Sequence, residues 1–410
     1  MLGITCRSCG RNSAHTLVDL GMSPLANAYI RPSESGRAEP FYPLRVYVCG
    51  SCFLVQIEAV APPEEIFSDY AYFSSYSDSW LDHARTYVDA AIQRFSLNRG
   101  SRVVELASND GYLLQYFIAA GVPVLGIEPA QNVAEAATAK GIPTRVRFFG
   151  ESTARELLAE GIRADLVIGN NVLAHVPALN DFVRGIKILL GERGAATLEF
   201  PHLMRLVAEN QFDTIYHEHY SYFSLLAVEQ VFRRHELAVF DVDELQTHGG
   251  SLRVYVCHLE DDSKPKQRRV DDLLEREKQA GLADLHYYAS FGERVKETKR
   301  KLLGFLIAAK GEGKTIAGYG AAAKGNTLLN YCGIRDDFID YVVDRNPHKQ
   351  GHLLPGTRIP IYDPEHVRHT RPDYLLVLPW NLKNEIIEQM SYIRNWGGRF
   401  IVPIPEVTVL

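Results

Sequence analysis

The sequence lacks several features that would place it in common classes of protein. It has no apolar run long enough to span a bilayer, although 46% of its 410 residues are hydrophobic. Its first residues, MLGITCRSCG, lack the charged-then-apolar pattern of a secretory signal. Basic residues are not in excess, since the formal net charge is -6, which argues against a dedicated nucleic-acid binder. We therefore expect a cytoplasmic monomer that binds neither membrane nor nucleic acid.

Cysteine is scarce, yet four of the six cysteines fall in two Cys-x-x-Cys pairs. In a chain without a secretory signal this arrangement favours a metal over disulfides. The paired thiolates of one turn can bind a tetrahedral ion, and two such knuckles complete a closed site that leaves no position for substrate. The alternative is four unconnected buried thiols. We predict a structural zinc site whose ligands are Cys6, Cys9, Cys49 and Cys52.

The pattern of the whole chain predicts an α/β protein with several domains, because 410 residues are too many for one ordinary core. Short strand-like pieces surround the cysteines. A helical repeat over 78–95 is followed by strands that alternate with helical patterns, which predicts a parallel sheet covered on both faces. A charged helical stretch precedes a second alternating set. We predict a zinc module at 1–68, a Rossmann-like domain at 69–258, a helical connector at 259–300 and a second Rossmann-like domain at 301–410.

The segment 103–114 predicts a ligand site between a buried strand and a helix. Its turn of small residues lets a ligand approach backbone N–H groups at the start of the helix. Because Ala107 and Asn109 stand where glycines would, it is not the Gly-x-Gly-x-x-Gly turn of dinucleotide-binding proteins. Glu105 would repel a pyrophosphate but suits the ammonium group of S-adenosylmethionine, and Glu128 can accept both ribose hydroxyls. The alternative is a structural turn without a ligand. The predicted cofactor-binding residues are Glu105, Ala107, Asn109, Asp110, Gly111, Leu113, Glu128, Pro129, Asn170 and Asn171.

Seven consecutive residues at 216–222, Tyr-His-Glu-His-Tyr-Ser-Tyr, form the richest candidate for chemistry. So many polar side chains are expensive to bury, so a core role is improbable. We predict that His219 takes a proton near neutral pH and that Glu218 orients or tunes it. His175, which follows the strand at the cofactor rim, is a candidate to polarise a substrate oxygen. Two alternatives are a surface loop and a second zinc site through His217 and His219.

Three further segments carry polar groups next to turns. Residues 70–76 place several tyrosine hydroxyls before the first long helix, with aromatic packing as the alternative. Residues 247–253 join a glycine turn to a strand that carries a cation, which predicts an anion contact. Residues 318–327 connect a strand to a helix through a turn with a lysine, which favours a phosphate cradle over a packing turn, although the residue order of a Walker loop is absent. Asp344, at the end of the next strand, is a candidate to accept a ribose hydroxyl.

With these motifs in this order, the chain resembles the nucleotide-sugar C-methyltransferases that make branched deoxysugars. The resemblance covers essentially the whole chain and rests on the two cysteine knuckles and on ELASNDGYLL, NNVLAHV, YHEHYSYFS, HGGSLR and GYGAAAKGNTLLNY. It implies an N-terminal zinc module, a central class I methyltransferase domain for S-adenosylmethionine, and a C-terminal Rossmann-like domain that helps to hold the nucleotide diphosphate. It also implies methylation at C-3 of a 4-keto-deoxysugar, usually TDP-linked.

The resemblance further implies roles for single residues. The base falls on His219, with Glu218 and Tyr216 beside it and His175 across the site. A tyrosine of 70–76 joins them, for which we favour Tyr72. The residues expected to bind the substrate are Tyr76, Tyr222, His248, Gly249, Arg253, Gly320, Lys324, Asn326 and Asp344.

The chemistry of such a reaction fits these residues. A proton next to a ketone has a pKa far above that of any side chain, so hydrogen-bond donors must stabilise the enolate while a base removes the proton. The carbanion-like carbon then attacks the sulfonium methyl group in line, which needs no catalytic metal and agrees with a closed zinc site. Two alternatives remain: O- or N-methylation of a related sugar or small metabolite, and a non-catalytic protein that binds a nucleotide sugar.

Overall fold

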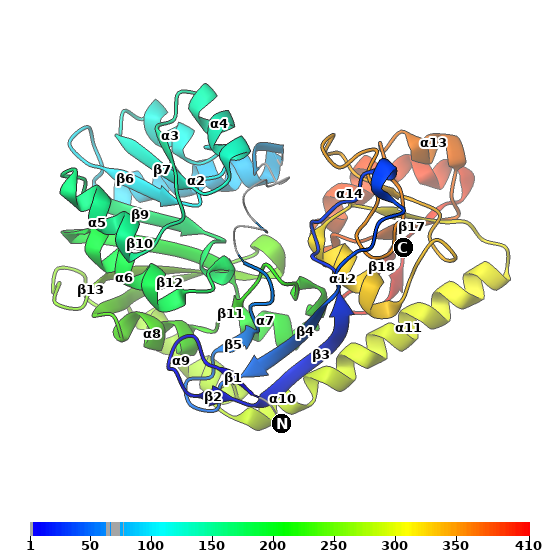
Figure 1. Cartoon of the computed structure of the whole chain (residues 1–410), viewed down its shortest axis with the longest axis horizontal. Coiled ribbons are helices and arrows are strands. Elements are labelled where there is room, and N and C mark those ends of the chain that lie inside the picture. The colour runs from blue at the N-terminus through cyan, green and yellow to red at the C-terminus, as the bar shows by residue number, and fades with distance from the viewer. Residues whose placement is uncertain (1–2, 63–65, 67–73, 77) are drawn as a thin grey trace.

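A computed structural model gives the architecture of the chain and describes residues 3–62, 66, 74–76 and 78–410. Figure 1 shows a central sheet on one side and a C-terminal sheet on the other, with the strands of an N-terminal module beneath and between them. In the described part of the chain, no helix combines the length and the apolar character needed to cross a bilayer. The fold is the predicted mixed α/β arrangement with a Rossmann-like core.

The N-terminal module holds two small antiparallel sheets. β1 (Ile4–Thr5) and β2 (Asn12–Ser13) flank the first cysteine knuckle, and the second knuckle lies between β4 (Tyr42–Val48) and β5 (Val55–Ile57). The larger sheet has the order β11-β5-β4-β3, where β3 spans His15–Ser23. Its fourth strand, β11 (Ser221–Tyr222), comes from far along the chain. The module is therefore completed by residues outside the predicted boundary of 1–68.

The central sheet has the strand order β12-β13-β10-β9-β6-β7-β8. Its strands are β6 (Val103–Leu106), β7 (Val124–Glu128), β8 (Thr144–Val146), β9 (Ala164–Asn170), β10 (Leu190–Pro201), β12 (Leu237–Leu245) and β13 (Ser251–His258). β6 to β10 pair in parallel, and β13 pairs antiparallel with β10 and β12. Because neighbouring parallel strands end at the same edge, the turns after β6, β7, β9 and β10 meet there.

Alternate residues of the central strands pack on opposite faces of the sheet, as the period of a strand requires. Val103 packs with one group of helices, and Val104 packs with the other. The first group is α2 (Asp78–Phe95), α3 (Leu114–Ala119) and α4 (Gln131–Ala139). The second is α5 (Glu151–Ala159), α6 (Leu179–Leu189), α8 (Leu225–Arg233) and α9 (Arg268–Ala280). The helix expected at 78–95 is confirmed as α2.

The C-terminal domain is a second sheet with the order β16-β15-β14-β17-β18-β19. All neighbouring strands in this sheet pair in parallel except β18 and β19, which are antiparallel. The strands are β14 (Ile316–Tyr319), β15 (Val342–Val343), β16 (Ile361–Tyr362), β17 (Tyr374–Val377), β18 (Arg399–Val402) and β19 (Thr408–Val409). The helices are α12 (Ala323–Cys332), α13 (His366–Thr370) and α14 (Lys383–Gln389), with 3-10 turns η6 (Trp380–Leu382) and η7 (Ser391–Trp396).

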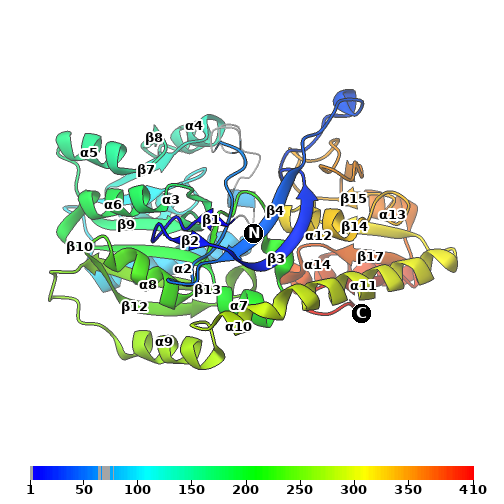
Figure 2. The ribbon, with the colours of Figure 1, turned by 60° about the horizontal axis from the view of Figure 1, so that its bottom comes forward.

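One hydrophobic core joins the N-terminal module to the C-terminal domain. It contains Leu17 of β3, Phe212 of η4 (Phe212–Thr214), Leu302 of α11 (Phe291–Gly311) and Ile316 of β14. Figure 2 shows α11 running from beneath β3 to the C-terminal sheet, and α10 (Leu285–Ala289) precedes it. The stretch 259–300, expected to be a separate connector, is divided: α9 packs in the core of the central sheet, whereas α11 belongs to this second core.

Candidate functional site

Two cysteine knuckles of the same shape bring four sulfur atoms together. Gly10 N donates to Cys6 O and Phe53 N donates to Cys49 O, both at 2.9 Å. Gly10 and Phe53 both have a positive φ, at 74° and 56°. The four sulfur atoms, including that of the half-buried Cys9, lie within 4.8 Å of one another. This set fits a closed tetrahedral zinc site with no position for a substrate.

The turn after β6 contains three residues with a left-handed backbone conformation. Ala107, Asn109 and Gly111 have φ values of 54°, 51° and 76°, and Asn171, after β9, has a φ of 53°. This left-handed conformation costs about 1–2 kcal/mol for a residue with a Cβ atom. Strain that gathers at the carboxyl edge of a parallel sheet points to a ligand site rather than a structural turn.

Three buried carboxyl groups lie at this edge: Glu105, Asp110 and Glu128 are 1%, 2% and 5% exposed. Two backbone N–H groups, one from Asn109, donate to the oxygens of Glu128 at 2.9 Å. Burial raises the pKa of Glu128 to about 7. Burial, with the charges of Glu128 and Asp110, raises the pKa of Glu105 well above its usual value. Lys140 Nζ lies 3.0 Å from Asp110 Oδ2 and forms no ion pair with another described carboxylate, so a bound cation would be stabilised here.

Several buried polar atoms at the same edge have no hydrogen-bond partner among the described residues: Glu105 Oε2, Asp110 Oδ1, and both Oδ1 and Nδ2 of Asn170. Such an atom costs about 1–3 kcal/mol if it stays unpaired. Carboxylates suit an ammonium group and an amide suits an adenine or carboxylate, so these atoms fit S-adenosylmethionine. Leu113 is buried just before α3, and Pro129 follows β7.

His219 has the geometry of a base with one fixed tautomer. Its Nδ1 lies 2.8 Å from the carbonyl of Thr214, which can only accept, so Nδ1 carries the proton. Its Nε2 lies 2.8 Å from Tyr216 Oη and therefore accepts from that hydroxyl. The ring of His175, from η3 (Leu173–His175), lies with its centroid 4.7 Å from that of His219. The structure thus brings together His219, Tyr216 and His175.

Both imidazoles are neutral near pH 7. Burial, with the nearby His175, lowers the pKa of His219 well below its usual 6.5. Burial lowers the pKa of His175 to about 4. The ring of Tyr222 lies 6.1 Å from that of His219, and burial raises the pKa of its hydroxyl. The site thus holds imidazoles that are unprotonated at neutral pH and available to accept a proton.

Glu218 is hydrogen-bonded by Asn27, a residue that the sequence analysis did not identify. Asn27 Nδ2 donates to both carboxylate oxygens of Glu218, at 2.8 and 2.9 Å. Tyr29 Oη donates to Ala321 O at 2.6 Å and lies 3.2 Å from Asn27 Oδ1. Asn27 and Tyr29 lie in a loop of the N-terminal module with no motif around them, so no local signal could have found them.

His248 lies beside Asn171, one of the residues predicted to bind the cofactor. Its Nε2 is 3.3 Å from Asn171 Nδ2, and its ring centroid is 5.0 Å from that of Trp80. His248 has a φ of 54° within η5 (Thr247–Gly249). Gly249 follows with a φ of 91°, and a Cβ atom there would lie 2.6 Å from Trp380, so only glycine fits.

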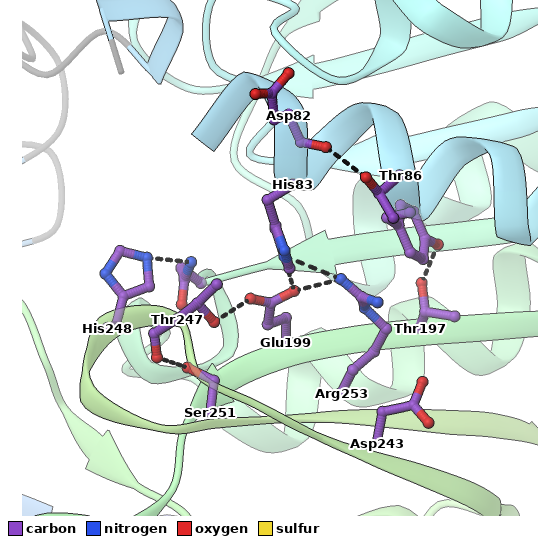
Figure 3. Close-up of polar contacts among 12 residues, drawn as sticks. Asp82, His83, Thr86, Thr197, Glu199, Asp243, Thr247, His248, Ser251 and Arg253 are labelled. Atoms are coloured by element: carbon purple, nitrogen blue, oxygen red, sulfur yellow. Dashed lines mark hydrogen bonds and ion pairs between the residues drawn. The ribbon is translucent and has the colours of Figure 1, made fainter. Parts of the chain in front are cut away.

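Figure 3 shows the polar network that holds η5. Glu199, fully buried near the end of β10, accepts from Thr247 Oγ1 at 2.9 Å and pairs with Arg253 Nη2 at 2.8 Å and His83 Nε2 at 3.0 Å. Burial acts to raise the pKa of Glu199, but His83 and Arg253 outweigh it and lower the pKa to about 2. Arg253 also lies 4.3 Å from the ring centroid of Tyr87. The cation expected to contact an anion is thus engaged with a buried carboxylate.

Lys324, on α12, reaches the same region from the C-terminal domain. Its Nζ donates to Asn381 Oδ1 at 2.9 Å and lies 4.9 Å from the ring centroid of Trp380. Trp380 Nε1 donates to Asp213 Oδ2 at 2.7 Å, and burial raises the pKa of Asp213 to about 7. Burial lowers the pKa of Lys324, whose charge also acts on His219. Thr327 Oγ1, also on α12, donates to Ile215 O at 3.0 Å, so the start of α12 lies beside the segment that leads to His219.

The remaining C-terminal candidates lie around the turn after β14. Gly320 has a φ of 92°. Asp344 accepts from Ala321 N at 2.7 Å. Asn326 is 1% exposed and its Nδ2 lies 3.4 Å from Ala26 O, so it contacts the N-terminal module. The predictions for Tyr72 and for the side chain of Tyr76 fall outside the described part of the chain.

Three family models match the chain in succession. A zinc binding domain matches residues 6–67, a methyltransferase domain matches 80–242, and a C-methyltransferase C-terminal domain matches 246–405. The four cysteines fall within the first of these matches.

One curated relative matches along almost its whole length. The chain is 38% identical over 408 residues to the C-methyltransferase NovU of Streptomyces niveus, which covers 99% of this chain and 96% of that protein. Among solved structures, an S-adenosylmethionine-dependent methyltransferase from Anabaena variabilis is 16% identical, with a TM-score of 0.36. The match covers 50% of this chain and 99% of that chain. Magnesium protoporphyrin IX methyltransferase from Synechocystis with bound S-adenosylmethionine is 14% identical, with a TM-score of 0.33, and 44% and 82% covered.

Proposed function

We propose that this chain, which belongs to the family of zinc-binding, S-adenosylmethionine-dependent C-methyltransferases, methylates C-3 of a TDP-linked 4-keto-deoxysugar. The observation that carries the proposal is the state of His219. One nitrogen is held as a donor by Thr214 O, and the other has a lone pair that is unprotonated at neutral pH. Methylation at carbon needs such a base, because a C–H bond must first be broken.

The 4-keto group acidifies the C-3 proton, and His219 Nε2 takes it. Without substrate, the hydroxyl of Tyr216 occupies the position at Nε2 that the C–H bond would take. Substrate displaces this hydroxyl, which then donates to the developing enolate oxygen together with His175. Glu218, clamped by Asn27, orients the sugar. S-adenosylmethionine would be held between the turn after β6 and Asn170. Its sulfonium would supply the methyl group to C-3, with cleavage of the S–CH3 bond and release of S-adenosylhomocysteine.

The nucleotide diphosphate lies at the C-terminal domain. The turn after β14 and Lys324 provide N–H groups and a cation for the pyrophosphate, and Asp344 accepts a ribose hydroxyl. His248, Gly249 and Tyr222 line the sugar. We assign zinc binding to residues 1–68, cofactor binding to 69–258 and nucleotide binding to 301–410, in a monomer. The stretch 259–300 links the last two regions and contributes α9 to the core of the central sheet and the start of α11 to the second core.

Incubation with a panel of 4-keto nucleotide sugars tests the proposal. A substrate deuterated at C-3 should lose its deuterium to water in the presence of S-adenosylhomocysteine and enzyme, because the base acts before methyl transfer. With S-adenosylmethionine, mass spectrometry should show a product heavier by one methylene and without C-3 deuterium. Methylation that leaves the C-3 deuterium in place would contradict methylation at C-3. Exchange of the C-5 proton with solvent would then separate methylation at C-5, the other carbon next to the ketone, from O- or N-methylation.

The pH profile is expected to follow His219. Because its pKa is lowered, the base stays unprotonated at pH values well below 6.5, so kcat should be constant through neutral pH and fall only in clearly more acid solution. The measurement is kcat at saturating S-adenosylmethionine, since Glu128, with a pKa of about 7, would otherwise contribute through cofactor binding. A kcat that halves near pH 6.5 would contradict the assignment.

A further inference from the structure

The catalytic loop, residues 216–222, is built into the N-terminal module. Its last two residues form β11, in which Ser221 pairs with Gln56 and Tyr222 pairs with Val55 of β5. Ile57 N donates to Tyr220 O at 3.1 Å, which extends this pairing toward His219. The strand that follows the base is therefore an edge strand of the zinc module's sheet.

Arg7, between the zinc ligands Cys6 and Cys9, connects the metal knuckle to this loop. Its Nη1 donates to Tyr220 O, 213 residues away, and lies 3.3 Å from Ser221 Oγ. Its Nη2 donates to Ile57 O at 2.7 Å. One guanidinium thus binds both strands of the β5–β11 pair, with the fork geometry that lysine lacks.

The backbone of Arg7 is held as firmly as its side chain. Arg7 N donates to Gln56 Oε1 at 3.1 Å, and Asn180 Nδ2, on α6, donates to Arg7 O at 2.9 Å. The position of the guanidinium is therefore set by the fold of the knuckle and by the central domain.

Two further contacts join the loop to the module. Asn27 clamps Glu218, as described above. His217 Nε2 donates to Pro43 O, at the start of β4, at 3.2 Å. Glu218, His217 and Tyr220, the neighbours of His219, thus all bind residues of the N-terminal module.

We propose that the zinc module holds the catalytic loop in position and that Arg7 is a positioning residue that couples the metal knuckle to His219. The inference rests on the proposed role of His219 as base. Zinc would hold Cys6 and Cys9 in one turn, and this turn sets the position of Arg7. Arg7 in turn binds the carbonyl oxygen of Tyr220, the residue that follows His219. A displacement of about 1 Å in a catalytic group can lower the rate by about 100-fold.

Arg7→Met tests this coupling without touching a zinc ligand. We expect kcat and the rate of C-3 deuterium washout to fall together by about 100-fold, with zinc content and the KM for S-adenosylmethionine unchanged. Arg7→Lys should recover part of the washout rate, because an ammonium group can still donate to one of the two carbonyls.

Two companion variants separate positioning from folding. Arg11→Met is the matched control, because Arg11 lies at the same knuckle and is exposed. Among the described residues, its side chain hydrogen-bonds Ser51 of the other knuckle alone, at 3.3 Å, so this variant should behave as the wild type. Asn27→Leu leaves the knuckle intact and removes the clamp on Glu218, so it should slow washout at normal zinc content.

Nitrogen NMR of the His219 ring provides a reading that needs no substrate. Its resonances should shift in Arg7→Met and stay in place in Arg11→Met. Unshifted resonances, or wild-type washout in Arg7→Met, would overturn the positioning role, as would zinc loss that parallels the loss of activity. If the wild type itself fails to wash out deuterium, the proposed substrate is wrong, and the NMR comparison still decides the role of Arg7.

Discussion

Replacement of His219 by alanine is expected to lower kcat by about 10²–10⁴-fold, the usual contribution of a positioned base. The variant loses the Nε2 lone pair that accepts from Tyr216 Oη, and His175 belongs to a different element, η3, with its ring centroid 4.7 Å from that of His219. Affinity for S-adenosylmethionine should persist, because the turn after β6, which we propose binds the cofactor, is not part of the loop that carries His219. Steady-state kinetics and isothermal titration calorimetry measure the two quantities.

His286→Ala provides a control for this substitution. His286 is exposed on α10 and should be replaceable without change in kcat. Loss of deuterium washout in His219→Ala alone would identify the base. A His219→Ala enzyme with the wild-type rate would contradict the assignment, and one that fails to bind S-adenosylmethionine would show a structural defect instead.

Loss of zinc is expected to unfold the N-terminal module. In small zinc domains the metal supplies about 10 kcal/mol or more of folding free energy, which is comparable with the entire stability of a typical protein, about 5–15 kcal/mol. Cys49→Ser, which removes one of the four ligands, should therefore lower both the zinc content and the Tm of the whole chain, because Cys49 also packs in the core of the central sheet. Scanning calorimetry and metal analysis test this.

Cys257→Ala is the matched control for the loss of a buried cysteine. Cys257 lies in β13, outside the four-cysteine cluster, so its replacement should leave zinc content unchanged and cost only the small loss of packing. A Cys49→Ser protein with normal stability would contradict a structural role for the metal.

The parts of the site that could be predicted from the sequence are those whose residues lie close together along the chain. The knuckles follow from cysteine spacing, and the turn after β6 follows from small residues between a strand and a helix. His219 and Tyr216 also lie in one seven-residue run. In each case the chemistry and the geometry come from residues a few positions apart, so local patterns contain the information.

The parts that the sequence did not predict depend on contacts between distant segments. The pairing of β11 with β5 joins the catalytic loop to the zinc module, and nothing in Ser221 or Tyr222 indicates that partner. Asn27 is an isolated amide in a loop. Glu199 offered a weak signal, an acidic residue inside an apolar strand, but its partners His83 and Thr247 lie on other elements.

The helical stretch after β13 shows why domain boundaries were harder to place than elements. Its charge pattern predicted a helical connector over 259–300, and α9 and α11 each bury one apolar face, in different cores. An amphipathic pattern predicts that one face of a helix is buried, but it does not identify the core against which that face packs.

The core that α11 shares with β3 bears on any attempt to change substrate preference by exchanging parts between relatives. Ile30 pairs with Leu353, and Glu39 accepts from Gly356 N at 2.7 Å, so the loop after β3 is seated on the C-terminal domain. A chimera cut between residues 258 and 301 would separate surfaces that pack against each other in this chain. Transplants that carry 15–48 along with the C-terminal half should express and fold where a simple tail exchange fails.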